Sequence, residues 1–473
     1  MKGKLWIVLL ALFVVFLMVP LFLDHRMKTV EETLARAQKD LESETGSAAD
    51  AETEKSTESE KNTEAETNTG TESRITENHT EEAEMGDAET EEEMIRVLIL
   101  SSEEDTQYHQ SVTVQCDKPY QTEQDGATSD HPETETFSLS SGDCQEGEVW
   151  ILSSEDGMFT LPSVIRSVQD LTYPGTLRIE KRKEGLVLIN ELPMEEYLMR
   201  VVPSEMPSSY PLEALKAQAV SARTYARKQK EAGRLREFGA DVDDSVNFQV
   251  YNNQAMNRRT TRAVKATEGV VMKQDGVLLD ALYYSTSCGI DLTRNLSEEA
   301  VFCSFISGTE ESDYEKEEPW YRWTTSFSLE EITKLARKSG LKVGRVEALK
   351  EGPRTEQGRL QSLTVTGKKG ETVVEGEYDI RTFLVPEETP VTLKNGEEAP
   401  DLGMLPSAFF YLEPILEENE LTGYELIGGG YGHGDGMSQN GARHMAEEGL
   451  TYQEILTHYY GEIEWDEESH TGD

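Results

Sequence analysis

The chain has 473 residues, of which 36% are hydrophobic, so it is long enough to bury a core and to form two or three domains. Its formal net charge is −46 at pH 7, with 91 acidic residues against 45 basic ones. This balance excludes a nucleic-acid-binding role, because phosphate binding requires concentrated positive charge. The acidic residues are unevenly spread, and their distribution indicates how the chain is organised.

The apolar run at residues 5–23, LWIVLLALFVVFLMVPLFL, holds no charged residue and is long enough to cross a bilayer as a helix. Basic residues flank it on both sides, so charge orients it only weakly. No small-residue cleavage site follows, because Asp24-His25-Arg26 comes instead. We therefore expect residues 1–28 to form a cytoplasmic tip and an uncleaved transmembrane anchor, with the rest of the chain outside the cytoplasm. A cleaved signal peptide is the alternative, and it would export the body as well.

Residues 29–93 form a strongly acidic segment made mainly of Glu, Thr, Ser, Ala and Asn. Between residues 31 and 93 there are 22 acidic and 5 basic residues, a net charge of −17. Such a composition cannot bury enough apolar surface to offset the loss of chain entropy, so we expect a disordered linker. As a flexible coil it would span about 45 Å between its ends, which suits a spacer between a membrane and a folded domain. A docking role for the acidic run is the alternative.

The folded body begins at residue 94 with short runs that are typical of β-strands. We expect strands at residues 94–100, 111–116 and 148–152, and a β-hairpin at 175–190 whose turn holds Lys183-Glu184-Gly185. Residues 117–147 are polar and rich in turn-forming residues, and they predict a long loop. We take residues 94–174 as a β-rich N-terminal part of the body.

Two helices are predicted next. The first begins near Pro193, has acidic residues in its first turn and ends close to Glu205. The second begins near Pro211, with Ser208 or Ser209 as its cap, and carries an alanine-rich face at helical spacing. An alanine-rich face should pack closely against neighbouring backbone.

The remainder of the body mixes strands with helices, and no internal repeat is present. We expect β-structure at residues 262–286, 359–367, 371–380 and 407–413, a helix at 328–340, and a helix that starts from the capping box Thr451–Glu454. This order of elements predicts an α+β fold, a β-rich body with inserted helices that form a cleft. The transmembrane helix and the disordered acidic tether precede this body.

Glu205 is unusual among the many acidic residues because it lies between Val201-Val202 and Met206-Pro207. The end of the first helix places unpaired carbonyls near it, and its apolar neighbours remove water. Both effects favour the protonated carboxyl and raise its pKa, as a general acid near neutral pH requires. The N-terminus of the next helix acts in the opposite direction, and we expect desolvation to dominate in a cleft. A structural glutamate bonded to backbone groups is the alternative that spacing alone leaves open.

Polar residues interrupt the alanine-rich surface of the second helix at Lys216, Gln218, Arg223 and Tyr225. Lys216 and Arg223 are seven residues apart, so they lie on the same face two turns away from each other. These side chains could hold a carboxylate or sugar hydroxyls. A solvated helix face is the alternative.

A second unusual stretch, GGGYGHGDGMSQNGA at residues 428–442, is very rich in glycine. Glycine allows the backbone to approach a ligand closely and to adopt positive φ. His433 lies between two glycines, which favours a role in a loop over packing in a core. The stretch is not a phosphate-binding loop, because no Gly-Lys-Ser/Thr follows it.

The four cysteines are Cys116, Cys144, Cys288 and Cys303. Outside the cytoplasm they could form the disulfides 116–144 and 288–303. Cys288 and Cys303 could instead belong to a zinc site, which would need two more ligands, or they could stay as free thiols. A serine hydrolase is not expected, because the chain has no Gly-x-Ser-x-Gly motif.

Two long motifs frame the body, LPMEEYLMRVVPSEMPSSYPLEALKAQAVSARTYA at 192–226 and GGGYGHGDGMSQNGARHMAEEGLTYQEILTHYYG at 428–461. Between them come DSVNFQVYN, AVKATEGVV, YYSTSCG, GRLQSLTVTG, YDIRTFL and LPSAFF. In this order the motifs resemble the stage II sporulation protein D family, which shares a domain with amidase enhancers. The resemblance covers residues 175–465, which we take as the family's domain, and leaves 466–473 as a tail.

This resemblance implies a lytic transglycosylase that cleaves the glycan strands of peptidoglycan during engulfment of the forespore. The glutamate of the family's Ser/Ala-Glu-Met-Pro motif is the catalytic acid and base, and here it is Glu205. The implied fold holds a glycan-binding cleft, and the implied substrate is a strand from which an amidase has stripped the stem peptides. Because the attacking group belongs to the substrate, a second carboxylate is not required.

The resemblance also implies which residues bind substrate and which partners the protein has. The substrate-binding residues would be Lys216, Gln218, Arg223, Tyr225, Tyr251, Ser285, Ser287, His433, Ser438 and Gln439. The implied partners are the glycan strands, a cell-wall amidase and membrane-embedded sporulation proteins, at a cell membrane where the body faces the wall. No cofactor is implied by the reaction itself.

The chain departs from the family pattern at two positions. Asp435 replaces a small apolar residue and adds a charge beside His433. In part of the family a zinc ion is held by His and Cys, but here Tyr284 stands in place of the His while Cys288 remains. Two other functions stay open: a non-catalytic wall-binding module that stimulates an amidase, and a structural link between membrane and wall.

Overall fold

The structure, a computed structural model, describes residues 92–101, 106–166, 171–289, 314–399 and 401–467. Within these residues the fold is mixed α+β with a β-rich body, as the sequence predicts. The apolar run at 5–23 and the acidic linker lie outside the described residues. Among the helices that are described, none has the length and apolarity needed to cross a membrane.

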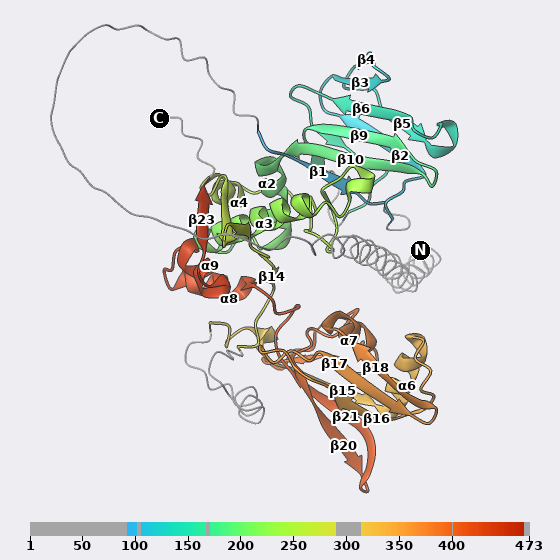
Figure 1. Cartoon of the computed structure of the whole chain (residues 1–473), viewed down its shortest axis with the longest axis vertical. Helices are drawn as coiled ribbons and strands as arrows, with labels where there is room; N and C mark the ends of the chain where they lie inside the picture. Colours follow the sequence, from blue (N-terminus) through green and yellow to red (C-terminus); the bar gives the residue numbers. More distant parts are fainter. Residues whose placement is uncertain (1–91, 102–105, 167–170, 290–313, 400, 468–473) are drawn as a thin grey trace, which may run out of the picture. The chain divides into compact units, whose positions relative to one another are not determined.

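The first part of the body is built on a seven-stranded sheet with the order β11-β1-β10-β9-β6-β3-β4 (Figure 1). Its strands are β1 (Met94–Ile99), β3 (Tyr120–Gln124), β4 (Ala127–His131), β6 (Val149–Ser153), β9 (Thr176–Lys181), β10 (Leu186–Pro193) and β11 (Val242–Asp243). The hairpin between β9 and β10 turns at residues 182–185, which confirms the sequence prediction. A domain boundary at residue 174 stays a prediction, and this sheet continues across it.

Strand β10 lies inside this sheet and is buried on both faces, as its continuous apolar sequence LVLIN requires. Leu186, Leu188 and Leu192 point into the main hydrophobic core. Val187 and Ile189 point to a smaller core on the other face. The strand therefore enters helix α2 from a firmly fixed position.

A smaller sheet beside it has the order β5-β2-β7-β8, with β2 (Ser111–Cys116), β5 (Phe137–Ser140), β7 (Phe159–Thr160) and β8 (Thr172–Tyr173). The expectation of a long loop at 117–147 is wrong, because β3, β4 and β5 lie there. Strand β4 has no buried residue, so no apolar alternation revealed it. The turn between β3 and β4 places Asp125 and Gly126 at positive φ, a conformation that an Asp-Gly pair favours.

Cys116 and Cys144 are both free thiols, so the disulfide 116–144, one of the pairings that the sequence allows, is not formed. Ser111 at the start of β2 pairs with Ser140, whereas Cys116 ends the same strand. Cys144 follows Ser140 closely and donates a hydrogen bond to its carbonyl at 3.1 Å. The two thiols thus belong to opposite ends of β2, a strand about 17 Å long.

Three helices follow the first sheet and lie side by side, α2 (Met194–Glu205), α3 (Leu212–Ala232) and α4 (Arg258–Lys265) (Figure 1). Pro193 precedes α2, and Pro203 removes one backbone donor near its end, so the helix ends at Glu205. Pro211, rather than a serine, is the N-cap of α3. The alanine-rich face of α3 is buried in the main core, as expected.

Helix α4 was not expected, because residues from 262 onward were assigned to β-structure. Its N-cap is Asn257, whose side chain accepts a hydrogen bond from the backbone of Arg259 at 2.9 Å. The predicted strands and turn follow as β12 (Val270–Gln274) and β13 (Val277–Leu278). The β-branched residues of the segment concealed a short helix that the cap and tertiary packing stabilise.

The C-terminal elements complete the same core. They are β22 (Met437–Ser438), α8 (Gln439–Glu447), α9 (Tyr452–Tyr460) and β23 (Glu464–Glu467). Strand β22 pairs in parallel with β14 (Tyr283–Tyr284), and β23 pairs with β12. Helices α8 and α9 both contact α3, and α9 begins with the predicted capping box of Thr451 and Glu454.

Residues 323–428 build a second hydrophobic core of their own. Its strands are β15 (Trp323–Ser328), β16 (Val346–Glu351), β17 (Ser362–Gly367), β18 (Gly370–Glu375), β19 (Thr392–Leu393), β20 (Phe410–Glu417) and β21 (Glu420–Gly428), and its helices are α6 (Leu329–Lys338) and α7 (Glu377–Phe383). The predicted helix at 328–340 is α6. The strand predicted at 371–380 ends at Glu375, and α7 follows after Gly376, whose φ is 87°.

Candidate functional site

Glu205 is the last residue of α2, and its side chain is half-buried between protein and solvent. Its neighbours Val202 and Met206 are buried in the main core. The backbone N–H of Met206 closes the helix by donating to the carbonyl of Val202 at 3.0 Å. The carboxyl group therefore lies at a helix end, in a largely apolar setting that solvent can still reach.

Two donors hold the carboxyl group of Glu205. The backbone N–H of Val250 donates a 2.6 Å hydrogen bond to Oε1, and the hydroxyl of Tyr283 on β14 donates a second one. Burial nevertheless outweighs these two bonds and raises the pKa of Glu205 to about 7. The carboxyl group is thus able both to give and to take a proton near neutral pH.

Tyrosine side chains surround this carboxyl group. The negative charge of Glu205 helps to raise the pKa values of Tyr197, Tyr225 and Tyr283, after the larger effect of burial. Gln249 donates to the Tyr283 hydroxyl at 3.1 Å and accepts from the Tyr197 hydroxyl at 3.2 Å. Gln249 thereby leaves the proton of Tyr283 free to point at Glu205.

Helix α8 supports the end of α2 from the other side. The amide nitrogen Nε2 of Gln439, the first residue of α8, donates to the backbone carbonyl of Glu205 at 3.0 Å. The same nitrogen donates to Oε1 of Gln218 on α3 at 3.2 Å. Gln218 and Gln439 therefore lie beside the catalytic candidate, and Gln439 positions its backbone.

The structure does not place Lys216 beside Glu205. The ammonium group of Lys216 pairs with Glu213 at 2.7 Å and lies 5.7 Å from the centre of the Tyr452 ring. These contacts direct it towards the start of α9. Helical spacing shows which face of α3 carries Lys216, but it does not show whether that face points towards Glu205 or towards α9.

Arg223 lies wholly inside the protein, with no exposed surface. Its guanidinium binds the Glu195 carboxylate through Nε at 2.7 Å and Nη2 at 2.6 Å, and Nη1 donates to the Val270 carbonyl at 3.1 Å. This geometry supports a structural role that joins α2, α3 and β12. It does not support the direct substrate contact that the resemblance implies.

Tyr251, another residue expected to bind substrate, is also buried. Its hydroxyl donates to Asn190 at 2.7 Å, and its ring stacks on Tyr197 at 5.2 Å. Its contacts therefore join the first sheet to α2. Tyr225, by contrast, lies close enough to Glu205 for the charge of this carboxylate to help raise the pKa of Tyr225, after the larger effect of burial.

Three serines from the predicted site lie together between β14 and α8. Ser438 is buried and caps α8 by accepting from the backbone of Gly441 at 3.3 Å. Its hydroxyl also accepts from the backbone of Ser287 at 3.2 Å and donates to the carbonyl of Ser285 at 3.4 Å. These serines fasten α8 to β14, and so they act on Glu205 through Gln439.

The glycine-rich loop packs tightly against the protein itself. Gly436 has a φ of 78°, and a Cβ there would lie 1.9 Å from the carbonyl oxygen of Leu282. A Cβ on Gly432 would lie 2.7 Å from that of Tyr284. The glycines thus allow the loop to reach β14, which explains their density without a ligand.

His433 in this loop is held in its neutral form. Its Nδ1 accepts from the backbone of Asp435 at 3.1 Å, so Nε2 carries the proton and donates to the carbonyl of Tyr283 at 3.0 Å. Burial lowers the pKa of His433 below its usual value. The extra charge of Asp435 is taken up by Arg359, at 2.5 Å. His433 therefore fixes the backbone of the residue that bonds to Glu205.

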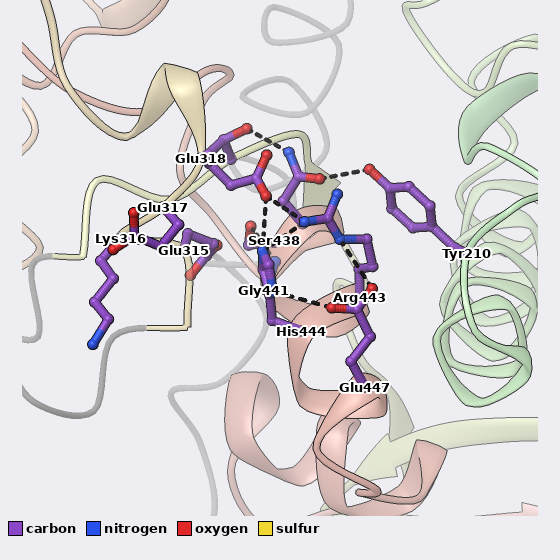
Figure 2. A network of polar contacts seen from close by, with 12 residues as sticks. Tyr210, Glu315, Lys316, Glu317, Glu318, Ser438, Gly441, Arg443, His444 and Glu447 are labelled. Carbon is purple, nitrogen blue, oxygen red and sulfur yellow. Dashed lines mark hydrogen bonds and ion pairs between the residues drawn. The ribbon is translucent and has the colours of Figure 1, made fainter. Parts of the chain in front are cut away.

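A polar network fastens the loop between α2 and α3 to α8 (Figure 2). The Tyr210 hydroxyl donates to Asn440 at 2.5 Å, and the guanidinium of Arg443 lies 5.4 Å from the centre of the Tyr210 ring. Arg443 and His444 both reach Glu318, at 2.5 and 2.7 Å. The residues immediately after Glu205 are thus held by α8 as well.

Cys288 is buried beside Phe409. Cys303 lies outside the described residues, so the 288–303 disulfide stays a prediction. Among the residues that the structure describes, no group of three or more His, Cys, Asp or Glu side chains could hold a metal ion. Tyr284, which replaces the family's His, supplies no nitrogen ligand. Because Cys303 lies outside the described residues, a zinc site at Cys288 and Cys303 stays a prediction as well.

Comparison with known proteins identifies the family. A family model for stage II sporulation protein matches residues 182–273, which include Glu205 and its helix. The chain is 31% identical over 295 residues to stage II sporulation protein D of Bacillus amyloliquefaciens, an alignment that covers 58% of this chain and 74% of that protein. The chain belongs to the stage II sporulation protein D family.

Other matches extend this result. Stage II sporulation protein D of Bacillus subtilis is 30% identical over 288 residues, with 58% of this chain and 74% of that protein covered. The amidase enhancer of the same organism is 28% identical over 297 residues, which cover 56% of this chain but 39% of the enhancer's length. A model for a domain of unknown function matches residues 270–436. The chain is thus similar both to stage II sporulation proteins D and to an amidase enhancer.

Sequence reasoning missed three parts of the site: the Val250 N–H, the Tyr283 hydroxyl and the Gln249 side chain that orients it. Gln249 and Val250 lie in the quoted motif DSVNFQVYN, and Tyr283 in YYSTSCG. One signal in the sequence could have revealed this part of the site: a polar side chain between two apolar residues, as in Phe248-Gln249-Val250. Burial of such a side chain requires a hydrogen-bond partner.

Proposed function

We propose that this protein is a membrane-anchored lytic transglycosylase that cleaves the glycan strands of peptidoglycan during sporulation. The observation that carries the proposal is the half-buried carboxyl of Glu205, whose pKa is raised to about 7 between a backbone N–H and the Tyr283 hydroxyl. An acid of this pKa is partly protonated at neutral pH and becomes an effective base once it has given up its proton. The family membership supports a role in sporulation.

The proposed reaction balances without water. Glu205 protonates the oxygen of the glycosidic bond, and the bond between this oxygen and C1 of the muramic sugar breaks. The C6 hydroxyl oxygen of the same sugar then bonds to C1, and its proton passes to the Glu205 carboxylate. Glu205 is thereby restored, and the new chain end carries an internal anhydro ring.

One carboxyl group is sufficient for this sequence of steps, because the nucleophile belongs to the substrate. In the described part of the chain, none of the hydrogen bonds of the Glu205 side chain comes from a second carboxyl group. A hydrolase of the common two-carboxylate kind would place a second acid within about 5–10 Å to activate water or to attack the sugar. The intramolecular route needs only Glu205 and its two donors, the Val250 N–H and the Tyr283 hydroxyl.

The proposal includes the setting of the enzyme. The anchor at 5–23 and the acidic linker at 29–93 would hold the body outside the cytoplasm, facing the wall. The substrate would be glycan strands whose stem peptides a partner amidase has removed. Other membrane-embedded sporulation proteins would complete the assembly.

The decisive experiment incubates the full chain with peptide-free glycan strands and analyses the products by mass spectrometry. We expect chain ends one water lighter than hydrolysis products, and their loss in Glu205→Gln. Glu231→Gln, which changes an exposed carboxylate on α3, is the matched control and should retain activity. Products with the mass of hydrolysis, or equal cleavage by Glu205→Gln, would refute the assignment.

The second candidate function is a non-catalytic enhancer of a cell-wall amidase. The observation that favours it is the similarity of this chain to an amidase enhancer. If this candidate is correct, the full chain would release no new chain ends but would accelerate peptide removal by an added amidase, and Glu205→Gln would preserve that stimulation. The two functions are thus distinguished by two measurements on the same substrate: release of new chain ends without an amidase, and the rate of peptide removal when an amidase is added.

A further inference from the structure

Three cations project from one face of α4 into an open groove. The groove has a volume of about 710 Å³ and is lined by Met256, Asn257, Arg258, Thr261, Arg262, Lys265 and Ala266. Arg258, Arg262 and Lys265 follow one another at spacings of four and three residues, so they share a helix face and span about 10 Å along the axis. The opposite face, with Ala263 and Val264, is buried against the other helices.

These cations differ from other exposed ones because three of them share one helix face and line the same groove without a carboxylate among its lining residues. In the part of the chain that the structure describes, the side chains of Arg258, Arg262 and Lys265 take part in no hydrogen bond or ion pair, and all three residues are exposed. Elsewhere, cations such as Arg227 on α3 are paired with a carboxylate. Three unpaired cations in one groove, in a chain with a net charge of −46, indicate a site for an external anion.

The start of α4 lies beside the residues that follow Glu205, because Arg259 donates to the backbone carbonyl of Tyr210 at 2.7 Å and α4 packs against α2. Val250 donates to the Glu205 carboxyl, and the backbone N–H groups of Asn253 and Gln254 both donate to the hydroxyl of Ser204, at 3.0 and 3.1 Å. Two residues later the chain reaches Met256, at the edge of the groove. A polymer seated at Glu205 could therefore extend along this segment onto α4.

We propose that this groove, the α4 groove, is a subsite that binds the free lactyl carboxylates of peptide-stripped glycan strands. This inference rests on the proposed function, and it names the feature of the substrate that the protein recognises, the free lactyl carboxylate. Removal of a stem peptide cleaves the amide bond to the lactyl group and leaves one carboxylate on each muramic sugar. An intact strand lacks this carboxylate at that position, because an amide occupies it.

The chemistry of the groove fits such a strand. Guanidinium groups bind carboxylates in a bidentate manner and are weakly hydrated, which suits an exposed subsite better than ammonium groups alone. Met256 and Ala266 add apolar surface, on which the less polar face of a sugar ring can lie. Because the groove is open, each ion pair is weak, and three are needed for a measurable preference.

The test compares two forms of one strand, the peptide-free glycan and the same glycan with its lactyl carboxylates converted to amides. Binding is measured with the full chain carrying Glu205→Gln, so that cleavage does not interfere. We expect the amidated strand to bind more weakly by on the order of tenfold, and the difference to shrink at high salt. Equal binding of the two strands would overturn the inference.

The α4 groove is then altered by the triple change Arg258→Ala, Arg262→Ala and Lys265→Ala. Alanine favours the helix, and the buried face of α4 is untouched, so the fold should persist, as thermal unfolding will check. We expect this variant to lose the preference for carboxylates and to bind both strands alike. A variant that keeps the full preference would show that the carboxylates are bound elsewhere.

A matched control removes the same charge from exposed cations away from α4, by Lys118→Ala, Lys183→Ala and Lys368→Ala. It should keep the preference, and an equal loss would mean that net charge rather than the α4 groove is responsible. If the α4 variant binds strands normally but no longer stimulates an amidase, the groove is a protein-binding surface, and the inference is refuted. Carboxylate-dependent binding without any cleavage would uphold the subsite while refuting the transglycosylase.

Discussion

Gln439 donates a 3.0 Å hydrogen bond to the backbone carbonyl of Glu205, which lies 234 residues earlier in the chain. The end of a helix normally leaves its last carbonyls without partners. Here a side chain from the start of α8 satisfies one of them and shares its amide with Gln218. The catalytic candidate is therefore fixed by a residue that contacts its backbone and not its carboxyl.

Replacing Gln439 by Ala should lower cleavage by about tenfold, because the carboxyl group of Glu205 is then held less firmly. The free energy of unfolding should fall by about 1 kcal/mol for the lost hydrogen bonds. Cleavage rates and urea denaturation measure the two effects. Gln357→Ala, at an exposed turn, serves as the control and should change neither. Full activity in Gln439→Ala would contradict the positioning role.

The pH dependence of cleavage should follow the protonation of Glu205. The step needs the protonated carboxyl, so kcat/KM should decrease as the pH rises through about 7. Initial rates on peptide-free strands between pH 3.5 and pH 9 measure the profile. A decrease centred near the ordinary glutamate pKa of 4.5 would mean that burial does not act on this group in the substrate-free enzyme.

The same shift in pKa predicts how stability depends on pH. The folded protein binds the proton of Glu205 more tightly than the unfolded chain, so this residue's contribution to stability declines between about pH 4.5 and about pH 7 and is constant above that range. Glu205→Gln should consequently be more stable than the wild type at pH 8, by up to about 3 kcal/mol, and similar at pH 4. Thermal or urea unfolding at both values tests this, and a difference that is the same at each pH would disprove it.

Tyr283→Phe should raise the pKa of Glu205 further, because the hydroxyl of Tyr283 stabilises the charged carboxylate. The decrease in kcat/KM should move to higher pH by up to about one unit. Tyr225→Phe is the control, since Tyr225 lies near Glu205, whose charge helps to raise the pKa of Tyr225, but the Tyr225 hydroxyl is not among the donors to the Glu205 carboxyl. A profile for Tyr283→Phe that stays in place or moves to lower pH would exclude the hydrogen bond.

Arg223→Met should destabilise the protein by about 3–5 kcal/mol, since it leaves the Glu195 carboxylate without its partner inside the fold. Adding Glu195→Leu to this variant should recover part of the loss, as a double-mutant cycle in urea would show. Lys183→Met, at an exposed turn, should change stability by less than about 0.5 kcal/mol. If Arg223→Met is as stable as the wild type but inactive, the residue contacts substrate after all.

The sequence predicted α2, α3 and the environment of Glu205 because the signals are local. Pro193 and Pro211 precede the two helices, and the apolar residues around Glu205 are its neighbours in the chain. The partners Val250, Tyr283 and Gln439 come from segments 45 to 234 residues away, and spacing within a motif does not reveal such contacts.

Local sequence patterns were misleading where tertiary packing determines the direction of a side chain or the presence of a strand. Helical spacing places Lys216 and Arg223 on one face, yet Lys216 points to the start of α9 and Arg223 enters the core between α2 and β12. In the same way, the polar strand β4 shows no alternation, because the sheet stabilises it through backbone hydrogen bonds with β3. Only the Asp125-Gly126 turn marked that hairpin in the sequence.

The region matched by the sporulation model, residues 182–273, contains Glu205 but neither Tyr283 nor Gln439. Buried side chains of α8 and α9 also close the core around α3. A truncated protein that ends at residue 273 would carry the acid without the two residues that orient it, and with one side of its core open to water. The smallest portion able to work as a unit therefore has to run through the last helix, and loss of a short C-terminal piece should inactivate a centre located more than 200 residues before it.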